Sequence, residues 1–331
     1  MLIQSTFKPA WWLKNCHLQT IFPSLLRKLP TPILRRERLV TPDNDFIDLD
    51  FYGEGDQPLV ILLHGLTGSS QSGYIKGLQP ALFQQGFRSV ALNFRGCSGE
   101  FNHSSRCYHS GETGDIDFLY HTLRTREPNT LMAAVGFSLG GNVLLKWLGE
   151  QGNKLQLFAA TAVSVPLVLS ECASKLDHGF SKFYRASLLT ELKDYIRLKK
   201  GYLASLDIND EARILNQLGD LETITSFWQY DDRVIAQLYD FKDVTDYYFR
   251  SSSRQFLQSI TVPTLLIQAK DDPFMTANVL PNLNELSPSV ALEITQRGGH
   301  VGFVTGNNPF KAEYWLEQRI PEFLQQKLEI T

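Results

Sequence analysis

From Pro58 onward, short apolar runs alternate with longer segments that have the residue spacing of helices. The runs are PLVILLHG, FRSVALNFRG, LMAAVGF, LQLFAATAVSVP, VPTLLIQAK and ALEITQRGG. Short runs that are apolar at every position are typical of strands buried on both faces, as in a parallel sheet between two layers of helices. Alternation of strand and helix favours right-handed crossovers between parallel strands. The sequence therefore predicts an α/β fold with a mostly parallel central sheet flanked by helices.

Two parts of the chain depart from this alternation. Residues 1–35 are interrupted by prolines and are expected to form an N-terminal arm, followed by an antiparallel hairpin of strands around Arg36–Thr41 and Phe46–Tyr52. Residues 167–257 are rich in charge and aromatics, and their apolar spacing is helical where any is visible. An unstructured loop of that length is improbable. We therefore expect one domain over residues 1–331, with a mainly helical cap inserted between two strands.

The composition excludes several classes of protein. Hydrophobic residues make up 43% of the 331 residues, charged residues make up 20%, and the formal net charge is -3. Because no basic stripe accumulates, we expect no nucleic-acid partner. Four widely spread cysteines without a CxxC pair argue against a redox or zinc motif. The first residues lack the pattern of a signal peptide, so a cytoplasmic location is expected.

Two groups of neighbouring acidic residues are candidate metal ligands. Asp231-Asp232 and the pair Asp115 and Asp117 place carboxylates close together, but no histidine stands at ligand spacing. We interpret these residues as solvated or helix-end charges and expect no metal and no cofactor. Cys16-His17 is interpreted as packing of the arm.

One pentapeptide, Gly136-Phe137-Ser138-Leu139-Gly140, lies directly between an apolar strand and an apolar helix. The pattern GxSxG alone is a weak signal, but a turn without an intervening loop forces the serine into a strained conformation that flanking glycines accommodate. The hydroxyl then stands at a helix N-terminus, where backbone amides favour negative charge. This context predicts that Ser138 is a nucleophile; the alternative is a serine that caps the helix.

A nucleophilic serine requires a base and an orienting acid. In the chain order Ser–Asp–His, the base should follow the last strand, and His300 does so directly after two glycines. The alternative for His300 is capping of the next turn. The acid should follow the preceding strand, where Asp271 and Asp272 are adjacent. Asp272 is favoured because it lies one residue deeper in the turn, with Asp271 solvated or holding the turn backbone.

An oxyanion hole requires two backbone amides. One is expected from Leu139, the residue after the nucleophile. The second is expected from Leu66, because Gly65 permits a sharp turn after the first parallel strand. His64 is interpreted as a support of this loop by hydrogen bonding rather than as a second base.

With these residues in place, the chain resembles the α/β-hydrolase superfamily, and more closely its YheT-like branch (AB hydrolase family 4). The resemblance covers nearly the whole chain and rests on NCHLQTIFP, LLHGLTGSSQSGYIKGL, NFRGCSGE, YHSGETGD, GFSLGGN, AKDDPF and GGHVGF, in this order. It implies a Ser–Asp–His hydrolase of ester or related acyl bonds, with the triad at Ser138, Asp272 and His300. One departure is Cys16, where the arm motif of the family often carries proline.

The expected reaction is cleavage of carboxylic esters through an acyl-enzyme, with a small-molecule or lipid-like acyl ester as substrate. Two alternatives remain open. An acyltransferase would use an alcohol or thiol in place of water. A non-catalytic binding protein could use the same fold, and the intact triad argues against it.

The cap and the arm carry many large apolar side chains. Those of the cap predict an apolar cleft for neutral acyl chains of short to medium length. They are Phe180, Phe183, Tyr184, Leu188, Leu189, Phe227, Trp228, Tyr247, Tyr248 and Phe249. Basic residues that could hold a headgroup or an anionic leaving group at the rim are Lys182, Arg185, Arg233, Lys242 and Arg250. The apolar groups of the arm, from Trp11 to Leu26, are expected to pack on the body, with peripheral membrane contact as the alternative.

Overall fold

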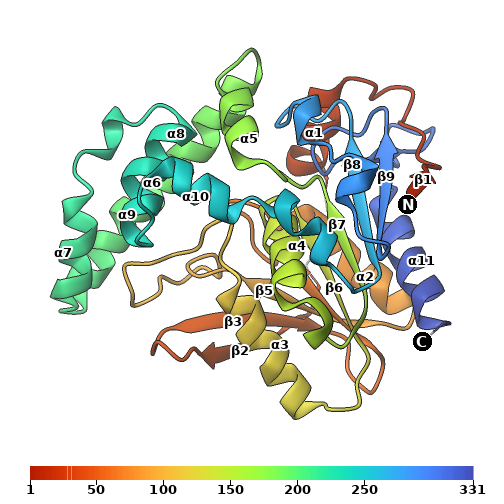
Figure 1. Cartoon of the computed structure of the whole chain (residues 1–331), viewed down its shortest axis with the longest axis horizontal. Helices are drawn as coiled ribbons and strands as arrows, with labels where there is room; N and C mark the ends of the chain where they lie inside the picture. Colours follow the sequence, from red (N-terminus) through yellow and green to blue (C-terminus); the bar gives the residue numbers. More distant parts are fainter. Residues whose placement is uncertain (28, 31, 331) are drawn as a thin grey trace.

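The computed structural model describes residues 1–27, 29–30 and 32–330, and a nine-stranded sheet lies at its centre (Figure 1). The strand order is β1-β9-β8-β7-β6-β4-β5-β3-β2. The strands are β1 (Leu2–Gln4), β2 (Arg35–Val40), β3 (Phe46–Tyr52), β4 (Leu59–Leu63), β5 (Arg88–Asn93), β6 (Met132–Phe137), β7 (Leu157–Val163), β8 (Thr264–Ala269) and β9 (Val290–Thr295). Only the pairs β2–β3 and β3–β5 of this sheet are antiparallel. The predicted α/β architecture with a mostly parallel sheet is confirmed.

The two faces of the sheet are buried by different helices. In β4, Leu59, Ile61 and Leu63 pack in one cluster with side chains of α3 (Gly114–Arg126) and α4 (Leu139–Gln151). The intervening Val60 and Leu62 pack in a second cluster with α2 (Gly73–Gln84) and α11 (Leu316–Leu328). Because successive strand residues point to opposite faces, a strand between two helical layers such as β4 is apolar on both faces.

A helical layer stands between β7 and β8 in the sequence and lies beside the sheet in Figure 1. Its helices are α5 (Leu169–Leu176), α6 (Ser181–Ser205), α7 (Asn209–Gln217), α8 (Phe227–Tyr230), α9 (Ala236–Leu238) and α10 (Val244–Ser251), with one π-helical turn at Asp231–Ile235 and a 3₁₀ segment at Ser253–Ser259. Along α6, Leu189, Leu192, Ile196 and Leu203 are buried at helical spacing. They join a cluster of apolar residues that is separate from the two on the sheet. We call this layer the cap.

The arm contains more regular structure than the sequence predicts. Residues Leu2–Gln4 form β1, which pairs in parallel with β9, and Cys16–Leu25 form α1, which Asn15 caps. The pairing of β1 joins residues about 290 positions apart, so no local pattern could have predicted it. Closer to the site, the buried amide of Gln19 donates to Leu13 O and accepts from Val304 N.

The C-terminal segment contains a short strand before its helix. Glu313–Tyr314 form β11, which pairs with β10 (Val304–Thr305), and α11 begins at Leu316. The guanidinium of Arg27 from the arm stacks on the ring of Tyr314 at 3.6 Å. Within the described ranges, no helix combines the length and apolarity needed to cross a bilayer.

Candidate active site

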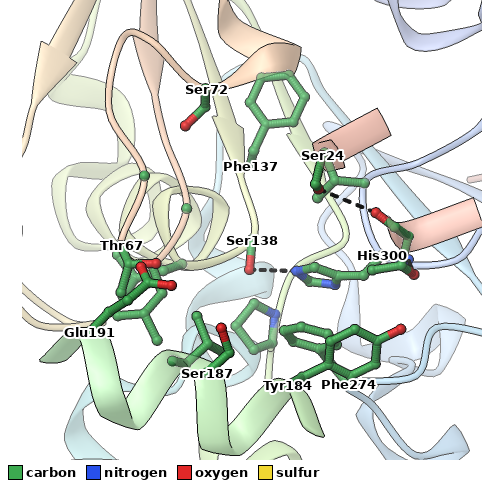
Figure 2. Close-up of a pocket in the computed structure, with 18 of the residues that line it drawn as sticks. Ser24, Thr67, Ser72, Phe137, Ser138, Tyr184, Ser187, Glu191, Phe274 and His300 are labelled. Carbon is green, nitrogen blue, oxygen red and sulfur yellow. Dashed lines mark hydrogen bonds between the residues drawn. The ribbon is translucent and has the colours of Figure 1, made fainter. Parts of the chain in front are cut away.

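Ser138 occupies the sharp turn between β6 and α4. Its backbone has φ 51° and ψ -119°, a strained conformation for a residue with a side chain, and its amide donates to Val163 O at 2.9 Å. A Cβ at Gly136 would lie 2.5 Å from Gly140 O, and a Cβ at Gly140 would lie 2.4 Å from His64 O. The glycines of the pentapeptide are therefore required by close backbone approach, and Ser138 is left facing the cavity (Figure 2).

A continuous chain of hydrogen bonds begins at the Ser138 hydroxyl. Ser138 Oγ lies 2.8 Å from His300 Nε2, and His300 Nδ1 lies 2.8 Å from Asp272 Oδ2. The other carboxylate oxygen of Asp272 accepts from Phe274 N at 2.8 Å. The Phe274 ring stacks on the His300 imidazole with centroids 4.1 Å apart and planes 1° apart. This geometry allows His300 to take the hydroxyl proton while Asp272 holds the imidazole in place.

The two adjacent aspartates occupy different environments. Asp272 meets the imidazole, whereas Asp271 Oδ1 accepts from Gly299 N at 3.0 Å and holds the backbone of the loop that carries His300. Burial, with the nearby Asp272 carboxylate as a smaller contribution, raises the pKa of Asp271. The arm also supports this loop, because Thr20 Oγ1 accepts from His300 N at 2.9 Å. The sequence contained no signal for this role of Thr20.

Two tyrosine hydroxyls hold the loop after β4. Tyr74 Oη accepts from Gly65 N, and Tyr108 Oη accepts from Thr67 N, each at 2.8 Å. Between these two paired amides, the amide of Leu66 has no hydrogen-bond partner among the described residues. The two tyrosines thus satisfy the neighbouring donors and leave the Leu66 donor available. Sequence reasoning missed both tyrosines, since neither lies at a diagnostic spacing from the nucleophile.

The second expected donor is at the start of α4. Leu139 is the first residue of this helix, so its amide has no carbonyl partner one turn earlier. Both Leu139 and Leu66 line the same cavity as Ser138. The two residues expected to supply the backbone donors therefore border the same cavity as Ser138.

His64 supports the loop after β4 through its hydrogen bonds and makes none with Ser138. Its Nε2 accepts from Phe94 N at 3.1 Å, so the ring proton is on Nδ1, which donates to Gly65 O at 2.7 Å. The ring is 1% exposed, and burial lowers the pKa of His64 to about 4. A neutral, doubly hydrogen-bonded imidazole is a structural support of the loop.

The cavity above Ser138 has a volume of about 1150 Å³ and is bounded by the arm, the strand-end loops and the cap. The arm contributes Ile21 and Leu25. The cap contributes Phe180, Phe183, Tyr184, Leu188, Phe227, Tyr247 and Tyr248. Other apolar residues of the predicted set lie elsewhere: Leu189 is buried in the cap core, and Phe249 is 71% exposed. The walls are thus mainly apolar and aromatic.

Comparison with known proteins places this architecture in a family. The sequence profile described as the alpha/beta hydrolase fold matches residues 58–307. The chain belongs to the α/β-hydrolase family. This α/β hydrolase is 39% identical over 328 residues to the Escherichia coli protein YheT, which is named as a candidate esterase, and the match covers 98% of this chain and 94% of that protein. It therefore belongs to the YheT-like branch.

More distant relatives of this α/β hydrolase carry the names of lipid-active enzymes. A mouse phospholipase is 27% identical over 99% of this chain and 80% of its own length. Among solved structures, an esterase of Pyrococcus furiosus superposes with a TM-score of 0.56 at 17% identity, covering 92% of this chain and 98% of that one. A likeness at that identity concerns the fold.

The acidic residues considered above lie at helix ends, as one of the two interpretations expected. Asp115 and Asp117 are in the first turn of α3, and Asp231 and Asp232 begin the π-helical turn. Asp115 is in addition a buried partner of Arg95, at 2.8 and 2.9 Å, and Asp231 is half-buried in the cavity wall. Among the described residues, no group of three or more His, Cys, Asp or Glu side chains could hold a metal ion.

The basic residues expected at the rim do not line the cavity. Arg185 pairs with Asp177 at 2.7 Å, and Arg250 pairs with Asp246 at 3.3 Å. Lys182, Arg233 and Lys242 are likewise outside the cavity wall. None of the five expected cations is therefore part of the cavity wall.

Proposed function

We propose that this α/β hydrolase cleaves carboxylic acyl esters through an acyl-enzyme formed on Ser138, with His300 as general base and Asp272 as the orienting acid. The observation that carries the proposal is the unbroken hydrogen-bond chain from Ser138 through His300 to Asp272, which opens into an apolar cavity. The names of its relatives, which include esterase, phospholipase and monoacylglycerol lipase, support an ester as the bond that is cleaved.

Acylation begins when His300 Nε2 accepts the proton of Ser138 Oγ and the oxygen attacks the ester carbonyl carbon. The carbonyl electrons move onto its oxygen, which the amides of Leu66 and Leu139 stabilise. Collapse of this intermediate breaks the bond to the alcohol oxygen, which leaves with the proton from His300. Water then repeats the sequence, with His300 as base, and releases the acid. Asp272 accepts from Nδ1–H throughout and stabilises the imidazolium.

The shape of the cavity predicts selection by acyl length. Each methylene buried against apolar walls contributes about 0.8 kcal/mol, or about fourfold in kcat/KM, until the space is filled. We expect kcat/KM for a series of nitrophenyl esters to rise over the first several carbons and then to fall. Ser187→Phe, on the cavity wall formed by α6, should move the maximum to shorter chains. A flat profile, or a preference for acetyl alone, would contradict an acyl site under the cap.

The mouth of the cavity supports a lipid-like substrate. Leu25 is 75% exposed, Phe183 is 68% exposed and Phe180 is 46% exposed, yet all three belong to the cavity wall. Apolar side chains that are open to water at the entrance suit an amphiphilic ester. Peripheral membrane contact through the arm stays the untested alternative to packing of the arm on the body.

The hydroxyls of Tyr74 and Tyr108, which hold the loop after β4, lead to a further prediction. Tyr74→Phe and Tyr108→Phe should each lower kcat by about tenfold with little change in KM, because misplacement of Leu66 N weakens binding of the oxyanion and not of the ester. Affinity for a trifluoromethyl ketone, which forms a tetrahedral adduct with serine, should fall in parallel.

Tyr120→Phe is the matched control for both variants. Tyr120 Oη also accepts from a backbone amide, that of Gln156, at 2.8 Å, but near the amino end of β7 and away from the cavity. All three variants should lose about 1 kcal/mol of unfolding free energy. If Tyr120→Phe lowers kcat as much as the other two, the effect is general destabilisation and the positioning role is refuted.

A further inference from the structure

Three carboxyl groups of the cavity wall have no part in the proposed mechanism: Glu191, which is exposed, Glu317, which pairs with Arg27, and Asp231. Asp231 follows α8 and begins the π-helical turn Asp231–Ile235 of the cap. Turns of this kind are uncommon and frequently occur at functional sites. Asp231 and Ser138 line the same cavity, so a substrate bound at Ser138 can extend toward Asp231.

The carboxyl group of Asp231 is only half satisfied. Its Oδ2 accepts from Tyr248 Oη at 2.7 Å. Within the described ranges, no donor reaches Oδ1 and no Lys, Arg or His pairs with the carboxylate. Burial without a compensating cation raises the pKa of Asp231 to about 7. An acceptor is therefore presented to the cavity from a wall that is otherwise mainly aromatic.

A plain hydrocarbon chain is a poor occupant of this position. It would displace water from Oδ1 and leave a buried acceptor without a partner, which costs free energy. A chain that carries a hydrogen-bond donor at this position would satisfy Oδ1 and still bury its methylenes against the aromatic rings. Sites built to bind a substrate hydroxyl strongly reject analogues that lack it.

We infer that the cap wall around Asp231 is a subsite for a hydrogen-bond donor on the ester substrate, either a hydroxyl or a protonated amine. This inference rests on the proposed function and adds the substrate class to it. Asp231 would then determine specificity without taking part in the bond-breaking steps.

The test compares esters that differ only in their terminal group. Two series of increasing chain length are used: nitrophenyl esters whose acyl chain ends in methyl, methoxy, hydroxyl or amino, and butyrate esters of alcohols that end in the same groups. Above pH 7, we expect kcat/KM of the hydroxyl or amino ester to exceed that of its methoxy analogue by about tenfold at one chain length. Whichever of the hydroxyl and amino esters has the higher kcat/KM identifies the donor group that the subsite prefers.

Asp231→Asn is the discriminating variant. The asparagine carbonyl can still accept from Tyr248, while the NH₂ group faces the cavity as a donor. We expect the preference for hydroxyl over methoxy to disappear or reverse in this variant. Asp232→Asn is the matched control, because Asp232 accepts from Val244 N at 3.0 Å and lies outside the cavity wall.

A second variant keeps the test independent of folding. Tyr248→Phe removes the donor to Oδ2 but leaves the carboxylate, so the preference for a donor should persist. If neither series shows a donor preference while methyl-terminated esters are hydrolysed in a Ser138-dependent manner, the subsite is refuted and the proposed function stands. If hydrolysis persists without Ser138, the proposed function itself fails.

Discussion

Replacement of Ser138 by alanine is expected to lower ester turnover by a factor of about 10⁶. The variant loses the oxygen that forms the acyl-enzyme. A water molecule near His300 is a poor substitute, because water is not held covalently in the position for attack as the Ser138 oxygen is. Folding should be unaffected. Alanine keeps the Cβ of serine, so the strained backbone at φ 51° is neither worsened nor relieved.

Two measurements check this expectation: the rate of ester hydrolysis and covalent labelling by a fluorophosphonate probe. Both should be lost in Ser138→Ala and retained in Ser187→Ala, which removes another hydroxyl from the same cavity wall. Labelling of the wild-type chain would exclude the non-catalytic alternative. Labelling that survives in Ser138→Ala would mean that the nucleophile is a different residue.

The second large effect is expected at the carboxylate. Asp272→Asn should lower turnover by about 10⁴, because the amide favours the imidazole tautomer with its proton on Nε2, which cannot then accept from Ser138. Substrate affinity should change little, since the Asp272 side chain is 1% exposed.

Asp271→Asn is the adjacent control, with an identical chemical change one residue earlier. Its Oδ1 can still accept from Gly299 N, so the loop that carries His300 should keep its position and turnover should fall far less. Steady-state rates of the two variants, each verified by thermal unfolding, decide the ranking. The opposite ranking would make Asp271 the acid of the triad.

The choice between these two aspartates illustrates what a sequence leaves open. Both follow β8, and the reasoning that favoured Asp272 used only its depth in the turn. The distinction depends on where the His300 ring comes to lie, 28 residues later. Similarly, the position of the expected Leu66 donor depends on the hydroxyls of Tyr74 and Tyr108. Tyr108 is 41 residues from its partner Thr67.

The sequence by itself determined the sheet and the turn that carries Ser138. Mainly apolar strands, helical spacing and glycines at close backbone contacts are local properties that can be read within a few residues. The sequence also indicated His300 as the candidate base, because His300 follows the last long strand.

Only the tertiary structure decided the pairing of β1 with β9, the support of His300 by Thr20 and the surroundings of Asp231. The paired strands are 290 residues apart, Thr20 and His300 are 280 apart, and Asp231 and Tyr248 are 17 apart. The residues next to Asp231 in the sequence do not reveal whether its carboxylate lies in water or beside Tyr248. Its exposure is set by the packing of α10 against the π-helical turn, and so the physical basis of the proposed specificity lies in contacts that no local pattern encodes.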